Sequence, residues 1–165
     1  MNKTAVVLVG LPGIGKSTLI QKINQDGNIF VYSTDSEIER LAFLEGRTYT
    51  EAFDDLISTA TKNMDYLVIE AVRRGEPIIW DQTNMSSKKR ARILRKLQDY
   101  KVDCFCWKIP ETADEISEHE RRLASRQDKQ IPSFVIENMK RSFQLPTVEE
   151  GFNSVTILDI NGNPI

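Results

Sequence analysis

The chain is organised around Gly10-Leu11-Pro12-Gly13-Ile14-Gly15-Lys16-Ser17-Thr18, which matches the P-loop pattern G-x-x-x-x-G-K-[ST] at every fixed position. Glycines let the backbone turn tightly, so that successive N–H groups point at an anionic phosphate. The first turn of the following helix adds free N–H groups and the positive end of its dipole. Lys16 supplies a mobile charge for the β and γ oxygens, and the Ser17 hydroxyl is a ligand for Mg²⁺. We therefore predict a nucleotide-phosphate site that holds Mg²⁺ on Ser17, with these cofactor-binding residues: Gly10, Pro12, Gly13, Ile14, Gly15, Lys16, Ser17 and Thr18.

The flanks of this loop have the order that a P-loop requires. Residues 4–9 are a short apolar, β-branched run, typical of a buried parallel strand. Leu19, Ile20 and Ile23 follow the loop at helical spacing. The order of strand, loop and helix favours a true phosphate site over a chance glycine-rich turn.

Length and composition indicate one ordinary globular domain over residues 1–165. Apolar residues make up 40% and charged residues 28% of the 165 residues. The formal net charge of −2 excludes a globally basic nucleic-acid binder and leaves local basic patches open. The chain opens directly on a strand pattern and holds no membrane-length apolar run, so we expect a cytoplasmic protein without a membrane partner.

The cysteines and the single histidine are not expected to take part in chemistry. Cys104 and Cys106 alternate along an apolar run and lack the spacing of a zinc site, so we predict reduced thiols in a strand. His119 lies in a polar helical stretch, and we expect it to face solvent.

The remaining pattern alternates strands with helices, which predicts a parallel sheet covered on both faces. Strands are expected at residues 29–33, 77–81, 102–109 and 154–158. Helices are expected from a cap at Ser36 to Gly46, from Thr50 to about residue 74, from Ser86 or Ser87 through the cationic run 88–97, over residues 112–125, and from Pro132. We therefore predict an α/β P-loop NTPase fold with a five-stranded parallel sheet, its P-loop strand central.

Acidic residues follow the expected ends of other strands. Asp35 and Asp81 come directly after such strands, and ligands collect at the carboxyl edge of a parallel sheet. The chain has no D-x-x-G after its third expected strand and no N/T-K-x-D motif, both of which a switch GTPase would need, and a lone Asp81 stands where a motor ATPase would usually have an acidic pair. A phosphotransferase fits better, with Asp35 as the base that accepts the acceptor's proton. Alternatively, Asp35 is an ordinary helix cap.

Arginines gather before a polar break at residues 127–130. Arg121, Arg122 and Arg126 lie on about one helical turn, and Arg122 and Arg126 share a face because they are four apart. A short lid with such a pair can clamp nucleotide phosphates and close over the site. The other interpretation is a solvated helix in which Glu118 and Glu120 pair with these arginines.

Together these motifs resemble the polynucleotide 5′-hydroxyl kinases of bacteriophages and of the metazoan DNA end-repair enzyme. The loop is similar to their G-x-P-G-S-G-K-S-T, with Ile14 in place of the serine. Ser33-Thr34-Asp35 stands where that family has its general base, and Asp81-Gln82-Thr83-Asn84 resembles the metazoan D-x-T-N. Residues 122–126 before Ile131-Pro132 resemble the R-x-x-x-R lid, and residues 143–152 resemble F-x-x-P-T-x-x-E-G-F. Ile38 departs from the phage enzymes, which place a basic residue there to touch the acceptor.

This resemblance implies ATP-dependent transfer of the γ-phosphoryl group to the 5′-hydroxyl end of DNA or RNA, with Mg²⁺ on Ser17. The catalytic residues would be Lys16, Asp35 and Arg126, with Arg122 beside Arg126 at the nucleotide. The implied acceptor-side residues are Asp35, Asp81, Thr83 and Asn84, the last three of which shape the acceptor side or hold a metal-bound water. A phage-encoded protein would act in the host cytosol.

Other interpretations remain open at this stage. The same loop, base and lid would serve a kinase for a sugar, nucleoside or antibiotic hydroxyl, which the net acidity suits. A non-catalytic ATP-binding partner in a repair complex is a third possibility, although the set of Lys16, Ser17 and Asp35 is complete. The cationic run 88–96 is either a track for nucleic-acid phosphates or a solvated helix face.

Overall fold

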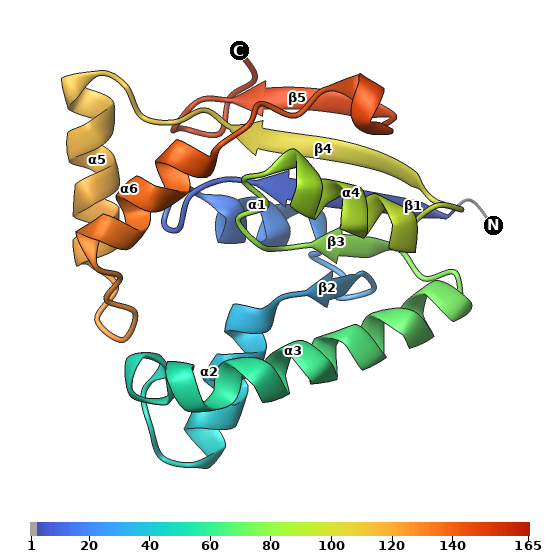
Figure 1. Ribbon diagram of the computed structural model, residues 1–165, viewed down its shortest axis with the longest axis horizontal. Helices are drawn as coiled ribbons and strands as arrows, with labels where there is room; N and C mark the ends of the chain where they lie inside the picture. The colour runs from blue at the N-terminus through green and yellow to red at the C-terminus, as the bar shows by residue number, and fades with distance from the viewer. Residues whose placement is uncertain (1–2) are drawn as a thin grey trace.

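The computed structural model describes residues 3–165, which alternate strands with helices along the chain (Figure 1). The strands are β1 (Thr4–Val9), β2 (Phe30–Tyr32), β3 (Ile78–Trp80), β4 (Lys101–Trp107) and β5 (Ser154–Leu158). The helices are α1 (Lys16–Ile23), α2 (Thr34–Leu44), α3 (Tyr49–Arg73), α4 (Ser87–Lys96), α5 (Ala113–Ala124), α6 (Ser133–Ser142) and the short 3₁₀ helix η1 (Val148–Glu150).

Within residues 3–165 the strands form one five-stranded sheet in the order β2-β3-β1-β4-β5, and every pair is parallel. In register, Val7 of β1 lies between Trp80 of β3 and Cys104 of β4. The predicted α/β fold is therefore confirmed, with the P-loop strand at the centre of the sheet. This topology brings the ends of β1, β2 and β3 to one edge, where the P-loop, Asp35 and Asp81 follow them.

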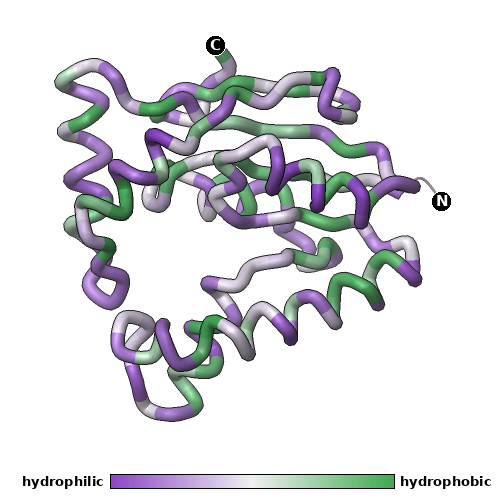
Figure 2. The backbone as a smooth tube through the Cα atoms, viewed as in Figure 1, coloured by the Kyte–Doolittle hydropathy of each residue, from purple (hydrophilic) through white to green (hydrophobic). Residues whose placement is uncertain are grey.

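Helices cover both faces of the sheet, as expected. On one face, Met64 and Val68 of α3 and Ile93 and Leu97 at α4 pack with the inward side chains of β1 and β4. On the other face, α1 contributes its partly buried apolar residues to a smaller cluster around Leu8, Ile79, Trp107 and Leu158. Figure 2 shows hydrophilic and hydrophobic turns alternating along α3, as expected of a helix with one face on the core.

The cysteines lie in β4, and both are free and buried. Burial raises the pKa of each thiol to about 12, so neither forms a reactive thiolate near neutral pH. The prediction of reduced strand thiols is therefore confirmed.

The helix starts differ from the sequence expectations by a few residues. The cap of α2 is Ser33, whose side chain accepts a hydrogen bond from the Ser36 N–H, so the predicted cap at Ser36 was wrong. The cap of α3 is Thr48 rather than Thr50, and Glu51 completes a capping box with it. A capping oxygen reaches an N–H two or three residues ahead, and a run of several Ser and Thr residues leaves that offset ambiguous in the sequence.

The loop between α5 and α6, residues 125–132 (hereafter the lid loop), contacts the start of α3. The N–H and hydroxyl of Thr50 donate hydrogen bonds to the Asp128 carbonyl, at 3.3 and 2.7 Å. The α2–α3 pair and the α5–α6 pair thus meet at their tips, although they stand on different sides of the sheet edge in Figure 1. Among the helices of residues 3–165, none combines the length and the apolar character needed to cross a membrane.

Candidate active site

A cavity of about 720 Å³ lies at the carboxyl edge of the sheet. Most of the residues singled out in the sequence line it: Pro12, Gly13, Ile14, Gly15, Lys16, Ser17, Thr18, Asp35, Asp81, Thr83, Arg122 and Arg126. The wall also includes residues that the sequence did not suggest: Glu39, Trp107, Lys129 and the turn after β5 at Ile160, Asn161 and Gly162. Gly10 and Asn84 do not line it.

The P-loop has the backbone geometry that its glycines permit. Gly13 and Gly15 have φ values of +74° and +125°, in the region that favours glycine. A Cβ at Gly13 would lie 3.0 Å from the Leu123 side chain of α5. Gly15, the cap of α1, has no side chain to occupy the N–H groups of the first helical turn. These N–H groups open toward the cavity, which fits a phosphate.

Lys16 is held back against its own loop. Its ammonium donates a hydrogen bond to the Gly10 carbonyl at 2.6 Å. Burial lowers the pKa of Lys16 to about 8, although the charges of Asp81 and Asp35 oppose this shift. A polyphosphate at the loop would stabilise the charged form, so the resting lysine is poised to gain a proton when an anion binds.

The two acids have different surroundings. Asp35 lies exposed in the first turn of α2, where the Tyr49 hydroxyl donates a hydrogen bond to its Oδ1 at 2.7 Å. Asp81 is half-buried after β3, and its N–H donates to the Tyr32 carbonyl at 2.8 Å. Burial raises the pKa of Asp81, Lys16 opposes this effect, and the charge of Asp35 adds to it. Asp35 is therefore the more accessible of the two carboxylates, and Asp81 lies deeper.

Asn84 does not contact the cavity, which contradicts its predicted place on the acceptor side. Its side chain is fully buried, and Nδ2 donates a hydrogen bond to the Leu8 carbonyl at 2.7 Å. Its φ of +50° is a left-handed conformation that asparagine tolerates better than most residues. Asn84 ties its loop to β1, and the neighbouring Thr83 carbonyl accepts a hydrogen bond from the Gly10 N–H at 3.0 Å. Thr83 itself lines the cavity, as predicted.

Helix α5 is docked on the P-loop by side chains on one of its faces. His119 is only 2% exposed, and its Nε2 donates a hydrogen bond to the Pro12 carbonyl at 2.8 Å, so the predicted solvent-facing position was wrong. Arg122 donates to the Ile14 carbonyl at 3.0 Å and to Glu118 at 3.0 Å. The sequence pattern of α5 did not indicate this face, because the residues that bond to the P-loop, His119 and Arg122, are themselves polar. Burial lowers the pKa of His119, which favours the neutral ring.

Arg126 presents an unmatched donor to the cavity. Its Nη1 atom is buried and finds no hydrogen-bond partner among the residues that the structure describes. A Cβ built at Gly13 would lie 3.9 Å from this atom, so the guanidinium stands over the P-loop. A buried donor without a partner is costly unless a ligand satisfies it. The arrangement of Arg126, Lys16 and the α1 N-terminus therefore fits a nucleoside triphosphate. The Ser17 hydroxyl lines the same cavity and is the kind of oxygen ligand that Mg²⁺ prefers.

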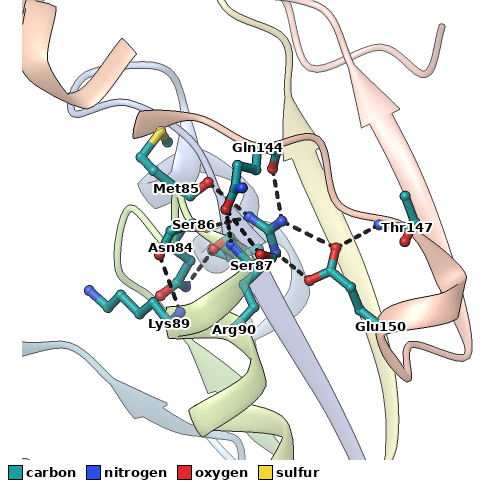
Figure 3. A network of polar contacts seen from close by, with 10 residues as sticks. Asn84, Met85, Ser86, Ser87, Lys89, Arg90, Gln144, Thr147 and Glu150 are labelled. Carbon is teal, nitrogen blue, oxygen red and sulfur yellow. Dashed lines mark hydrogen bonds and ion pairs between the residues drawn. The ribbon is translucent and has the colours of Figure 1, made fainter. Parts of the chain in front are cut away.

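The middle of the cationic run is structural rather than exposed (Figure 3). Arg90 has no exposed surface, and its guanidinium donates to Glu150 at 2.9 and 3.2 Å and to the Gln144 carbonyl at 2.8 Å. It also donates to the carbonyls of Asn84 and Met85, at 2.9 and 3.0 Å. The segment 143–152, noted in the sequence for its motif, is therefore held to α4 and to the 81–85 loop.

The flanking cations of α4 are accessible. Lys88 and Arg92 are exposed. Lys89 is half-buried, and burial lowers its pKa, with Arg92 adding to this effect and Asp35 opposing it. Neither interpretation left open by the sequence included an internal cation such as Arg90, and the exposed Lys88 and Arg92 are compatible with both.

A curated protein of Schizosaccharomyces pombe, described as a bifunctional polynucleotide phosphatase/kinase, is 28% identical to this chain over 152 residues. The match includes 91% of this chain but only 32% of that protein, so the chain spans about a third of its length.

Solved structures share the fold. A chain from the PezAT toxin–antitoxin system of Streptococcus pneumoniae aligns with a TM-score of 0.66 at 16% identity, covering 99% of this chain and 70% of that one. A gluconokinase from Sinorhizobium meliloti aligns with a TM-score of 0.58 at 15% identity, covering 96% of this chain and 83% of that one. At these identities the likeness shows the P-loop kinase fold. The sequence model of a family described as an AAA domain matches residues 6–146, most of the chain, and the protein therefore belongs to that family.

Proposed function

We propose that the protein is an ATP-dependent polynucleotide 5′-hydroxyl kinase that acts on the ends of DNA or RNA. The observation that carries the proposal is the convergence of Lys16, Asp35 and Arg126 on one cavity. The 28% identity to a polynucleotide phosphatase/kinase extends over 91% of this chain, and it supports a polynucleotide acceptor.

In this reaction the oxygen of the acceptor hydroxyl attacks the γ-phosphorus of ATP, and the bond to the β–γ bridging oxygen breaks to release ADP. Asp35 accepts the hydroxyl proton, since its carboxylate lies exposed at the cavity. Lys16 and the P-loop N–H groups hold the β and γ phosphates. Mg²⁺ on Ser17 would supply neutralising charge for the same oxygens.

Arg126 would stabilise the transition state from the lid, because its Nη1 is buried at the cavity and has no hydrogen-bond partner within residues 3–165. A preorganised donor of this kind costs little reorganisation at the moment of reaction. Arg122 already donates a hydrogen bond to the Ile14 carbonyl, so its main role would be to hold α5, and with it the lid loop, over the phosphates. Asp81 and Thr83 would shape the acceptor side of the cavity.

Labelled Mg-ATP, offered with a panel of hydroxyl acceptors, tests the reaction. We expect label on a 5′-hydroxyl oligonucleotide, no transfer by Lys16→Ala, and retained Mg-ATP binding but no transfer by Asp35→Asn. Loss of nucleotide affinity in Asp35→Asn would make that residue structural or nucleotide-directed instead.

The acceptor class has its own test, because a polynucleotide engages phosphates beyond the reacting hydroxyl and releases counterions. Acceptor affinity should fall with salt and improve from a nucleoside to a short oligonucleotide. Neutralising Lys88, Lys89 and Arg92 together should flatten the salt dependence without changing ATP affinity.

The net charge of −2 favours a second candidate, a kinase for a small hydroxyl compound. Such an enzyme would use the same base and lid and would show neither the salt trend nor the length trend. Equal efficiency on a nucleoside and an oligonucleotide, insensitive to salt, would select this candidate.

A further inference from the structure

Tyr49, the first residue of α3, lies beside the carboxylate of Asp35. Its hydroxyl donates a hydrogen bond to Asp35 Oδ1 at 2.7 Å. Among the residues that the structure describes, none donates a hydrogen bond to the other oxygen, Oδ2. The two residues are 14 apart in sequence, so this contact depends on the return of α3 along α2. A donor bound to one carboxylate oxygen restricts rotation of the group and leaves the second oxygen for another partner.

The Tyr49 hydroxyl remains a donor at ordinary pH. Burial raises the pKa of Tyr49 above its usual range, and the negative charge of Asp35 adds to that shift. Tyr49 therefore keeps its proton while Asp35 accepts and releases one.

A capping box and two side chains fix the position of the tyrosine ring. The capping box of Thr48 and Glu51 sets the first turn of α3. The Phe53 ring lies with its centroid 5.5 Å from that of Tyr49, and the Lys129 ammonium lies 5.1 Å from the Tyr49 ring centroid. Because Lys129 belongs to the lid loop, one face of the ring is held by the lid.

Further contacts hold the lid loop in this place. Lys129 pairs with Glu39 of α2, and the Asp128 carbonyl accepts from both the N–H and the hydroxyl of Thr50, the residue after Tyr49. The lid that carries Arg126 is thus connected to Asp35 through the first turn of α3.

We propose that Tyr49 is a positioning residue that holds Oδ1 of Asp35, so that Oδ2 faces the acceptor hydroxyl when the lid loop is docked. This inference rests on the proposed function, in which Asp35 is the base. The proton of the acceptor hydroxyl moves to Oδ2, and Tyr49 keeps its own proton throughout.

The substitution Tyr49→Phe tests this role, because it removes the hydroxyl and leaves the ring for Phe53 and Lys129. Tyr66→Phe is the matched control, an identical change on the same helix at a side chain that is 66% exposed. For each variant we would measure thermal stability, and also kcat and KM for Mg-ATP with whichever hydroxyl acceptor the wild-type protein phosphorylates.

In Tyr49→Phe we expect kcat to fall roughly tenfold with an unchanged KM for Mg-ATP, as for the loss of one charge-assisted hydrogen bond. Tyr66→Phe should match the wild type.

A Tyr49→Phe protein with wild-type kcat would overturn the inference, while an inactive Asp35→Asn protein would leave the proposed function standing. A fall in kcat matched by lower thermal stability and by a higher KM for Mg-ATP would also overturn it and make Tyr49 structural. Full activity in Asp35→Asn would instead remove the proposed base, and with it the role of Tyr49.

Discussion

Arg90 and Arg126 both bury guanidinium atoms, yet their surroundings are opposite. Arg90 uses all of its N–H donors, on Glu150 and on the carbonyls of residues 84, 85 and 144. Arg126 keeps Nη1 buried without a partner in the described part of the chain, at a cavity lined by the P-loop. A satisfied guanidinium holds segments together, whereas an unsatisfied one has donors left for a ligand. In the proposed function, this difference separates a residue of the framework, Arg90, from a residue of the reaction, Arg126.

The largest effect is expected for Arg126→Ala. Turnover should fall about 10³-fold, because a cation over the transferring group acts most strongly in the transition state. Binding of Mg-ATP should weaken much less, and the melting temperature should stay near that of the wild type. Steady-state kinetics and calorimetry with the same preparation measure both. A pure loss of affinity with unchanged turnover would contradict this role.

The opposite pattern is expected for Arg90→Met. Removing Arg90 leaves Glu150 without its cation and the carbonyls of Asn84 and Gln144 without the Arg90 donors, while the Met85 carbonyl still accepts from the Gln144 N–H. The free energy of unfolding should therefore fall by about 3–5 kcal/mol. Adding Glu150→Leu should recover part of that loss, since no unpaired carboxylate then remains. Arg95→Met, at an exposed position of the same helix, is the control for chemical denaturation. Equal stability of the Arg90 and Arg95 variants would show that the internal network contributes nothing.

Lys16 is intermediate between Arg90 and Arg126, because its ammonium donates a hydrogen bond to the Gly10 carbonyl but also lines the cavity. Burial lowers the pKa of Lys16 to about 8. At pH 8 the free protein holds this lysine about half protonated, so Mg-ATP binding should take up about half a proton. At pH 6 Lys16 is already charged in the free protein, so Mg-ATP binding should cause no proton uptake by Lys16. Calorimetry in buffers of different ionisation enthalpy measures the proton count. The same uptake in Lys16→Arg, whose guanidinium is always charged, would assign it to another group.

The smallest effect is expected for Arg121→Ala, which adds an exposed arginine to the comparison of Arg90 with Arg126. This side chain is exposed and pairs with Glu118 within one turn of α5. An exposed pair of this kind contributes little, so turnover and Mg-ATP affinity should each change less than about twofold. A loss as large as that of Arg126→Ala, measured in the same assay, would mean that the lid acts through its total charge rather than through one placed donor.

The sequence by itself determined the parts of this protein that depend on consecutive residues. The P-loop is a run of nine residues whose φ values and helix start follow from its own glycines, so its pattern predicted the phosphate cradle and the central strand. The alternation of strands and helices likewise predicted the parallel sheet and its functional edge. The placement of Asp35 and Asp81 at one cavity with the P-loop followed from that topology.

Only the tertiary structure decided which polar side chains are internal. Arg90 and its partner Glu150 are 60 residues apart, and His119 bonds to a carbonyl 107 residues away, so no local pattern distinguishes them from solvated neighbours. The contact of Tyr49 with Asp35 has the same origin in the packing of α3 on α2. A charged or polar residue is stable inside a protein when distant segments supply its hydrogen bonds, and those segments meet only in the folded chain.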